Sequence, residues 1–413
     1  MPHAPIFVGS AAAVTTPFRE DGSLDLYSFD RILDFILERN TDAVVVCGTT
    51  GEASTLTDEE RTALIARCIK KVNKKIPVIA GTGSNNTVHA LELSQKAADL
   101  GVDALLLVTP YYNKTTQKGL VEHYGFIAER VALPMIVYNV PSRTGLNILP
   151  ETYAELKEIP NIVAIKEANG NVSALCKTFG LCRDSLDVYS GDDALITPCL
   201  SLGAKGVISV LANICPAQVH ELCTSFFEGD HTTAAMIQTD YHDLIEALFC
   251  EVNPVPVKVA QSLLGLCTDT VRLAASRKDE RKRKGTACFG NASALSFAMT
   301  GGCSEYCRIT INYSADTKKT SEFLRALAEA GIETHALCGS FGKKNRLTFT
   351  TRAANVAAAL RSVALLNTDG KRTKTRVEVC RTFDIVPFRG LSSISEDETP
   401  LSVSATRIEK AKF

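Results

Sequence analysis

The 413-residue chain lacks any long apolar run, and none approaches the length of about 18 residues that spans a membrane. Its opening residues, MPHAPIFVGSAAAVTTPF, lack the basic stretch and long apolar core of a secretory signal peptide. Hydrophobic residues make up 45% and charged residues 22%, as in ordinary globular proteins. We therefore expect a soluble protein with no membrane partner, long enough for one large domain and one smaller domain.

The fourteen cysteines form no CxxC pair, and Cys47, Cys199 and Cys250 lie within apolar runs. We interpret them as reduced core thiols of a cytoplasmic protein. Cys303 and Cys307 are close in sequence, but no further His or Cys completes a zinc site. The seven histidines are scattered and show no metal-ligand spacing, so the sequence predicts no metal.

The net charge of −1 is unevenly divided along the chain. Residues 277–413 hold 24 Lys and Arg against 14 Asp and Glu, whereas residues 1–276 hold 21 against 32. This asymmetry favours two parts with different histories or partners. The basic run at 276–285 has no interleaved aromatic residues, so it is typical of a solvated linker and predicts no nucleic-acid partner.

Short apolar runs alternate with helical patterns over the first 225 or so residues. Eight candidate strands follow: 11–18, 43–48, 77–81, 104–109, 134–139, 162–167, 187–191 and 206–210. Eight strands in this alternation predict a parallel (β/α)8 TIM barrel, with an open doubly wound sheet as the alternative. No GxGxxG or GxxxxGK loop follows a strand, which argues against nucleotide binding. Helices are expected at 58–73 and 87–100, the first with a capping box from Thr57 to Glu60.

The predicted domain order is a barrel over 1–228, a helical segment over 229–275, a linker over 276–302, a small α+β domain over 303–390 and a loose tail over 391–413. The helical segment is read as two helices, 231–250 and 254–266. In the small domain, strands near 307–314, 333–341, 345–352 and 374–380 and helices near 317–331 and 353–367 give a β-α-β-β-α-β order, which is ferredoxin-like.

Lys166 lies in the apolar run VAIKEA, at residues 163–168. Burial disfavours a charged ammonium, so a lysine here is expected to reach the neutral form that attacks a carbonyl to give a Schiff base. The alternatives are a core lysine paired with an acid, or a strand-end lysine that reaches water.

Other polar motifs end the neighbouring strands, where a TIM barrel places its active site. Gly48 and Gly51 in GTTGE permit a tight turn that can cradle a carboxylate, although a plain turn has the same pattern. Tyr138 is a candidate proton carrier or else a core tyrosine, and Arg143 is a candidate carboxylate ligand or else a surface arginine.

The set GTTGE, TPYYNK, YNVPSRTG, VAIKEA, the GDD element, GVISV and NPVPVK closely resembles the dihydrodipicolinate synthase family of class I aldolases, over about residues 5–272. The resemblance implies a lyase that needs no cofactor and condenses pyruvate with (S)-aspartate 4-semialdehyde in the diaminopimelate route to lysine. It also implies a homotetramer. A sialate or keto-deoxy-sugar lyase and a non-catalytic sensor barrel are the alternatives, and Arg143 argues against a sugar aldehyde.

The same resemblance implies roles for individual residues. Lys166 would form the Schiff base, while Tyr138, Thr49 and Tyr112 would relay protons, with Tyr112 reaching a neighbouring subunit's site. Thr50 would bind the pyruvate carboxylate and Arg143 that of the semialdehyde, and Gly191 and Ile208 would line the pocket through their main chain.

Two features depart from the family's pattern. Lysine-sensitive members usually have a glutamate at the position of His89; the positions matching their effector site are Ala53, Ser54, Asp58, Arg61, Asn85, His89 and Tyr111. Since His89 supplies no anion for a lysine ammonium, we expect weak or absent lysine inhibition. The C-terminal extension resembles an ACT domain, which predicts control by an amino-acid effector; a diverged family tail is the alternative.

Overall fold

The computed structural model describes residues 4–183 and 185–272, residue 325, and strands at 306–313, 335–340, 345–352 and 376–381. The chain divides into two compact units, Met1–Lys278 and Asp279–Phe413. The predicted linker at 276–302, the basic run at 276–285, the tail at 391–413, Cys303 and the helices expected at 317–331 and 353–367 lie outside the described residues.

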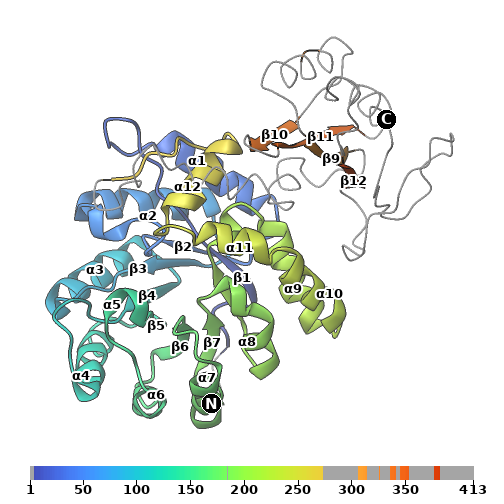
Figure 1. Ribbon diagram of the computed structural model, residues 1–413. Coiled ribbons are helices and arrows are strands. Elements are labelled where there is room, and N and C mark those ends of the chain that lie inside the picture. The colour runs from blue at the N-terminus through green and yellow to red at the C-terminus, as the bar shows by residue number, and fades with distance from the viewer. Residues whose placement is uncertain are drawn as a thin grey trace. The chain divides into compact units, whose positions relative to one another are not determined.

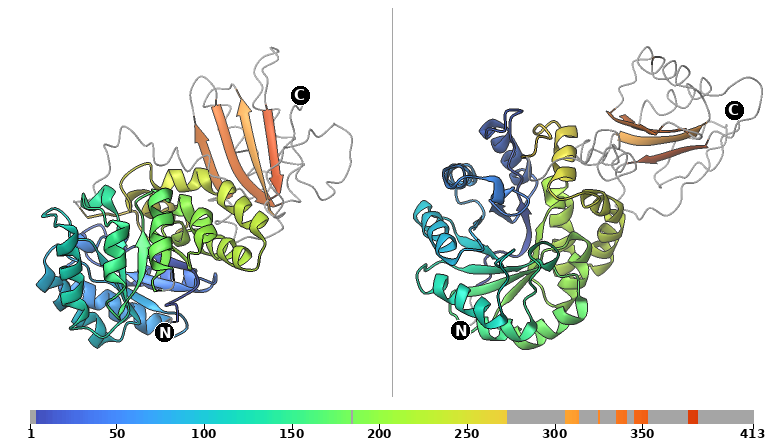
Figure 2. Two further views of the ribbon diagram at one scale, coloured as in Figure 1. Left: turned by 90° about the horizontal axis from the view of Figure 1, so that it is seen from below. Right: turned by 60° about the vertical axis from the view of Figure 1, so that its left-hand side comes forward.

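The first unit is a closed barrel of eight parallel strands in chain order, ringed by helices (Figures 1 and 2). The strands are β1 Gly9–Ala13, β2 Ala43–Val46, β3 Val78–Gly81, β4 Ala104–Val108, β5 Met135–Asn139, β6 Ile162–Glu167, β7 Asp187–Ser190 and β8 Gly206–Ser209. The pairing of β1 with β8 closes the barrel, which confirms the TIM-barrel prediction over the open sheet.

Helices alternate with the strands in the order expected of this fold. They are α1 Leu26–Leu37, α2 Asp58–Val72, α3 Thr87–Leu100, α4 Gln117–Ala128, α5 Pro141–Thr144, α6 Pro150–Leu156, α7 Val172–Cys182, α8 Ile196–Leu202, α9 Pro216–Phe227, α10 His231–Asp240, α11 His242–Leu248 and α12 Val255–Leu263. Single 3-10 turns lie at η1 Ala53–Thr55, η2 Asp193–Leu195 and η3 Leu211–Asn213. Among the described helices, none is both long and apolar enough to cross a membrane.

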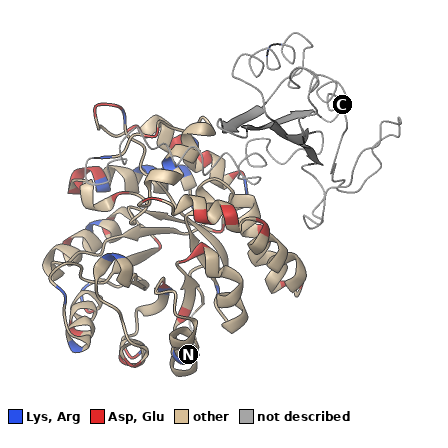
Figure 3. Ribbon diagram, viewed as in Figure 1, with Lys and Arg blue, Asp and Glu red and all other residues tan. Residues whose placement is uncertain are grey.

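Charged side chains lie mostly on the helices and loops around the barrel (Figure 3). Within the eight strands of the barrel the charged residues are Lys166, Glu167 and Asp187. A parallel sheet covered by helices has nearly continuous apolar strands, because both of its faces are buried. Lys166 and Glu167, at the end of β6, are therefore exceptions to the apolar character of the other barrel strands.

Local signals place several elements where the sequence predicts them. β6 and α3 have the predicted bounds, and α2 begins with the predicted capping box, in which the Thr57 side chain and the Glu60 side chain each accept from the other residue's backbone N–H. The first strand is displaced: β1 ends at Ala13 rather than reaching residue 18. Thr15 N–H leaves the ladder for Asn213 Oδ1 at 3.3 Å, and Pro17 has no N–H to donate.

Two further expectations are wrong. The single helix expected over 231–250 is two, because Tyr241 turns the chain with φ −94° and ψ 0° between α10 and α11. Cys47 and Cys199 are buried, but Cys250 is exposed, since it follows the end of α11 at Leu248. Cys47 and Cys199 are free thiols.

In the second unit four strands form one antiparallel sheet in the order β10-β11-β9-β12. They are β9 Tyr306–Tyr313, β10 His335–Ser340, β11 Asn345–Arg352 and β12 Arg376–Arg381. Each lies where the sequence predicts a strand, to within two residues at most ends.

Candidate active site

The candidate residues lie at the carboxyl ends of neighbouring barrel strands. Tyr138 on β5 and Lys166 on β6 are in register, and Lys166 is in turn opposite Tyr189 on β7. Side chains at one register level of adjacent strands share a face of the sheet. The Lys166 Nζ consequently lies 4.2 Å from the centroid of the Tyr138 ring. The structure thus brings together the predicted Schiff-base lysine and the predicted proton carrier.

Lys166 is buried, with only 6% of its surface exposed. Burial lowers the pKa of its amine to about 7; the Asp193 carboxylate opposes this change and the Arg143 guanidinium adds to it. Within the described part of the chain no carboxylate forms an ion pair with this amine. The two alternatives for this residue, a paired core lysine and a lysine reaching water, are therefore both wrong.

Gly191 follows β7 and faces the lysine side chain. A Cβ at this position would lie 3.0 Å from Lys166 Cε and 2.9 Å from the Ala168 Cβ, so any larger residue would displace the lysine. Gly191 N–H donates to the Glu167 carbonyl at 2.7 Å, which fixes this approach. Ile208 on β8 is buried in the same barrel interior. Both positions agree with a role in lining the space around Lys166.

Tyr138 is buried and lines a cavity together with Thr49. Burial raises the pKa of its phenol to about 12, while the Arg143 guanidinium and the nearby Thr49 side chain act in the opposite direction. The phenol is therefore protonated at neutral pH and can donate its proton to an oxygen beside Lys166. Because Thr49 lines the same cavity, its hydroxyl is the candidate partner of Tyr138 in passing a proton on.

The GTTGE loop forms a turn in which Gly51 N–H donates to the Gly48 carbonyl at 3.1 Å and Glu52 N–H to the Thr49 carbonyl at 3.1 Å. The tight turn expected from Gly48 and Gly51 is therefore present, and the amides of Gly51 and Glu52 are used within it. Thr50 is buried in this turn, and its Oγ1 accepts from Asn253 Nδ2 at 2.9 Å. The backbone N–H groups of Thr49 and Thr50, which have no backbone acceptor among the described contacts, and the two hydroxyls are the donors left for a carboxylate.

Arg143 is on the short helix α5, where its guanidinium donates to the Asn253 carbonyl at 3.2 Å. It lines a cavity of about 230 Å³ together with Thr49 and Tyr138. Ala53, Ser54, Arg61 and Tyr111 line the same cavity. One cavity is thus lined both by the candidate proton carriers, Thr49 and Tyr138, and by part of the candidate regulatory set.

Other predicted residues lie apart from this cavity. Tyr112 is 90% exposed, so within the chain it lies apart from the buried Tyr138. His89 Nε2 lies 3.1 Å from Asp58 Oδ1, and the Asn85 carbonyl accepts from the Asn113 side chain. Neither His89 nor Asn85 lines the cavity.

Glu167 is a buried hub that the sequence pattern does not single out. Its carboxylate accepts from Asn139 Nδ2 at 3.0 Å, from the Tyr153 hydroxyl at 2.9 Å and from Asn169 N–H at 2.9 Å. Burial raises its pKa to about 7 against these bonds. Because Asn139 and Glu167 follow Tyr138 and Lys166 directly, their contact holds the ends of β5 and β6 together. Two adjacent polar residues ending neighbouring strands are the signal that could have found it.

Asp193 is a second buried acid near the lysine. Its Oδ2 accepts from the backbone N–H groups of Val210 and Leu211 at 2.9 Å each, while its Oδ1 is buried without a described partner. Burial raises its pKa, and its charge acts on Lys166. It is therefore placed to balance a positive charge that forms on the lysine nitrogen.

Comparison with known proteins adds an independent finding. Residues 6–288 match the model of the dihydrodipicolinate synthetase family. The 4-hydroxy-tetrahydrodipicolinate synthase 1 of Clostridium acetobutylicum is 51% identical over 276 residues, 67% of this chain and 94% of that protein. The 4-hydroxy-tetrahydrodipicolinate synthase of Caldicellulosiruptor saccharolyticus is 52% identical over 280 residues, 68% of this chain and 95% of that protein. The crystal structure of a dihydrodipicolinate synthase from Thermotoga maritima aligns with a TM-score of 0.68 and 40% identity, covering 70% of this chain and all of that one.

Proposed function

The chain belongs to the dihydrodipicolinate synthetase family, and we propose that Lys166 is the residue on which it forms a Schiff base with pyruvate. The protein is a class I aldolase-type lyase: it condenses pyruvate with (S)-aspartate 4-semialdehyde to give 4-hydroxy-tetrahydrodipicolinate, in the diaminopimelate route to lysine. The observation that carries the assignment of Lys166 is its buried amine, without an ion-pair partner among the described residues, 4.2 Å from the Tyr138 ring centroid.

The reaction begins when the neutral Lys166 amine attacks the C2 carbonyl of pyruvate. The carbinolamine hydroxyl takes a proton from Tyr138 and leaves as water, which gives the iminium; loss of a C3 proton then gives the enamine. The enamine C3 attacks the aldehyde carbon of the semialdehyde; the iminium at C2 re-forms, and the new alkoxide takes up the proton that C3 had released, which gives the hydroxyl of the product. The amino group of the semialdehyde attacks C2, closes the ring and displaces Lys166, which regenerates the enzyme. The reaction as written uses no metal or cofactor.

Tyr138 and Thr49 would carry the protons of these steps, with Tyr112 supplied by a neighbouring subunit. The cavity that Tyr138 and Thr49 line together, and the effect of the Thr49 side chain on the Tyr138 phenol, support the first part. The 90% exposure of Tyr112 supports the second, because a tyrosine directed away from its own cavity is free to enter another subunit's. We accordingly propose a homotetramer in which each site is completed by a neighbour.

The two substrates would be held by their carboxylates, that of pyruvate by Thr50 and that of the semialdehyde by Arg143. Gly191 and Ile208 would line the pyruvate pocket. Arg143 in the cavity lining favours an acidic aldehyde over a sugar, because a guanidinium binds a carboxylate bidentately. The test is pyruvate consumption with a panel of aldehydes: turnover with aspartate semialdehyde and none with N-acetylmannosamine is expected. The opposite preference would overturn the assignment.

We further propose that lysine inhibition is weak or absent at the candidate regulatory set, Ala53, Ser54, Asn85, His89 and Tyr111. His89 is already paired with Asp58, so this carboxylate is not free to bind an incoming ammonium. His89→Glu is expected to introduce or strengthen lysine inhibition in the steady-state assay. Strong inhibition of the parent that this substitution leaves unchanged would contradict the proposal.

The C-terminal extension is proposed to be an ACT-like module that senses an amino acid. The antiparallel order β10-β11-β9-β12 supports it, since a β-α-β-β-α-β chain places its third strand between its first and second in this way. Deletion of residues 277–413 is expected to keep catalysis and to change the response to an effector. An identical response to every amino acid after deletion would refute it.

We place the enzyme in the cytoplasm. Among the described cysteines of the barrel, Cys176 is an exposed free thiol. An exposed free thiol suits a reducing compartment, where disulfides do not accumulate. Fractionation of cells that make the full chain tests this.

A further inference from the structure

The segment NPVPVK, residues 253–258, contacts the GTTGE loop at two points. Asn253 Nδ2 donates to Thr50 Oγ1 at 2.9 Å, and Lys258 Nζ donates to Glu52 Oε1 at 2.6 Å. These pairs are 203 and 206 residues apart in the chain. The start of α12 and the loop after β2 are therefore held together by these contacts. The reaction steps on Lys166 do not explain why the segment makes them.

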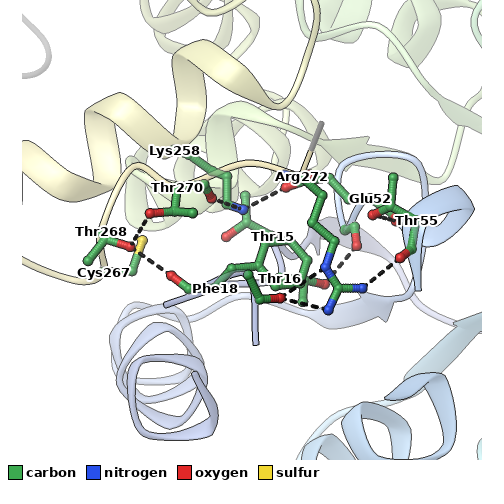
Figure 4. A network of polar contacts seen from close by, with 12 residues as sticks. Thr15, Thr16, Phe18, Glu52, Thr55, Lys258, Cys267, Thr268, Thr270 and Arg272 are labelled. Carbon is green, nitrogen blue, oxygen red and sulfur yellow. Dashed lines mark hydrogen bonds and ion pairs between the residues drawn. The ribbon is translucent and has the colours of Figure 1, made fainter. Parts of the chain in front are cut away.

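The Lys258–Glu52 pair is fully enclosed, with side chains 0% and 2% exposed (Figure 4). Lys258 also donates to the Thr270 carbonyl at 2.6 Å and lies 4.3 Å from the Phe18 ring centroid. The second oxygen of Glu52 accepts from Arg272 N–H at 3.1 Å. Each end of the pair is thus hydrogen-bonded a second time, as a buried ion pair requires.

Glu52 needs such support because of its backbone. Its φ of +54° and ψ of +36° are left-handed, a conformation that residues other than glycine adopt only where the surroundings hold them. Glu52 closes the turn that contains Thr49 and Thr50, through its N–H bond to the Thr49 carbonyl. Releasing the carboxylate would therefore allow the turn to relax and both threonines to move.

Asn253 determines which way the Thr50 hydroxyl can donate its proton, because it occupies one of the acceptor sites of that hydroxyl. A hydroxyl has one proton and two acceptor sites. Since Thr50 Oγ1 accepts from Asn253, its own proton remains available for another acceptor, such as a substrate carboxylate. The Asn253 carbonyl also accepts from Arg143 at 3.2 Å. One residue consequently contacts both groups that are assigned to substrate carboxylates.

We propose that Asn253 and Lys258 are positioning residues for substrate binding: Asn253 directs the Thr50 hydroxyl toward the pyruvate carboxylate, and Lys258 holds the loop through Glu52. The proposal rests on the proposed function of Thr50. In this proposal the NPVPVK segment increases the affinity for pyruvate. It takes no part in the bond-making steps on Lys166.

The first experiment is a double-mutant cycle between Asn253→Ala and Thr50→Val. Asn253→Ala is expected to raise the KM for pyruvate about tenfold, the effect of losing one well-directed hydrogen bond to a charged group. In the Thr50→Val background it should raise the KM no further, because Asn253 acts through the Thr50 hydroxyl. An unchanged KM, or effects that simply multiply in the double variant, would overturn the proposal.

Asn253→Asp tests the polarity separately. Aspartate has nearly the same shape, but its carboxylate only accepts hydrogen bonds, so the Thr50 hydroxyl would donate to it and no longer to pyruvate. This substitution should therefore raise the KM for pyruvate more than Asn253→Ala does. Asn161→Ala is the matched control. Asn161 donates to the Ala128 and Val131 carbonyls at the opposite end of β6, so its loss should lower the unfolding temperature and leave the KM unchanged.

The second experiment replaces the ion pair by the neutral double variant Glu52→Gln/Lys258→Met. Either single substitution leaves one buried charge unpaired and is expected to impair folding, whereas a neutral replacement of a whole buried pair is often tolerated. We expect a folded protein with an unfolding temperature near the parent's and a KM for pyruvate raised at least about fivefold, the loss of one ordinary hydrogen bond. A folded double variant with the parent's KM would show that the pair serves stability alone.

Asp30→Asn/Arg67→Met is the control for this variant, because that ion pair joins α1 to α2 and contacts no residue of the loop. It should leave the KM for pyruvate unchanged. Borohydride trapping at saturating pyruvate distinguishes failure of the positioning roles from failure of the proposed function. An adduct on Lys166 in the parent and in both variants, with a raised KM in the variants, supports the positioning roles. An adduct with an unchanged KM in the variants overturns the positioning roles only, and no adduct in the parent overturns the proposed function.

Discussion

Lys166 should destabilise the fold in a pH-dependent way, because its burial disfavours the ammonium. The usual pKa of a lysine amine is 10.5, and burial lowers that of Lys166 to about 7. At 1.36 kcal/mol for each tenfold change in the ionisation constant, the fold prefers the neutral amine by about 5 kcal/mol. Replacing Lys166 by methionine, which has similar length and no charge, removes this preference.

The sign follows from proton linkage. Between pH 7 and pH 10.5 the unfolded chain holds a proton on this amine that the folded chain has released, so stability rises with pH across that window. Below pH 7 both states are charged, and the folded state bears the full cost of burial. Lys166→Met should therefore stabilise the protein by about 4 kcal/mol at pH 7 and by only about 1 kcal/mol at pH 10.

Urea unfolding of the parent and of Lys166→Met at pH 7 and pH 10 measures this difference. Lys118→Met is the control, since the Lys118 side chain is 85% exposed and its removal should change stability little at either pH. A stabilisation of Lys166→Met that is equal at both pH values would refute the claim that burial makes this amine neutral near pH 7.

Three further predictions concern turnover. Tyr138→Phe keeps the ring beside Lys166 but removes the hydroxyl, so kcat should fall about 100-fold or more while pyruvate can still be trapped on Lys166; an unchanged kcat would remove Tyr138 from the proton path. Arg143→Lys should raise the KM for the semialdehyde about tenfold and leave that for pyruvate unchanged, since an ammonium does not replace a bidentate guanidinium; equal changes in both would contradict this. Lys166→Ala and Tyr112→Phe subunits that are mixed and reassembled should recover activity that neither variant has alone, because the Lys166 of one subunit then meets the Tyr112 of the other. Mixtures no more active than their components would show that Tyr112 does not contribute to the neighbour's site.

The fold was largely predictable because its signals are local. The alternation of apolar strands with helical segments, and the capping box from Thr57 to Glu60, depend on residues close in sequence. The same is true of β6, whose bounds match the predicted strand. Errors occurred where distant residues decide the local structure, as at the end of β1, where Thr15 turns away from the ladder to bond Asn213.

The candidate site shows the same limit. Lys166 and Lys258 are both buried lysines in apolar surroundings, and their sequences do not tell them apart. Lys258 has Glu52 within 2.6 Å, from a residue 206 positions away, whereas no carboxylate among the described residues pairs with Lys166. Whether a buried lysine is a structural ion or a reactive amine thus depends on a partner that no local pattern reveals.

Borohydride reduction of the enzyme with pyruvate, followed by peptide mass spectrometry, identifies the lysine that carries the Schiff base. We expect a single reduced adduct on Lys166, with trapping that increases as pH rises through about 7 because the neutral amine is the nucleophile. Lys166→Ala, folded as the parent is, should give none. A parent enzyme that is folded and active with aspartate semialdehyde, yet gives no adduct or an adduct on another lysine, would contradict the assignment of Lys166.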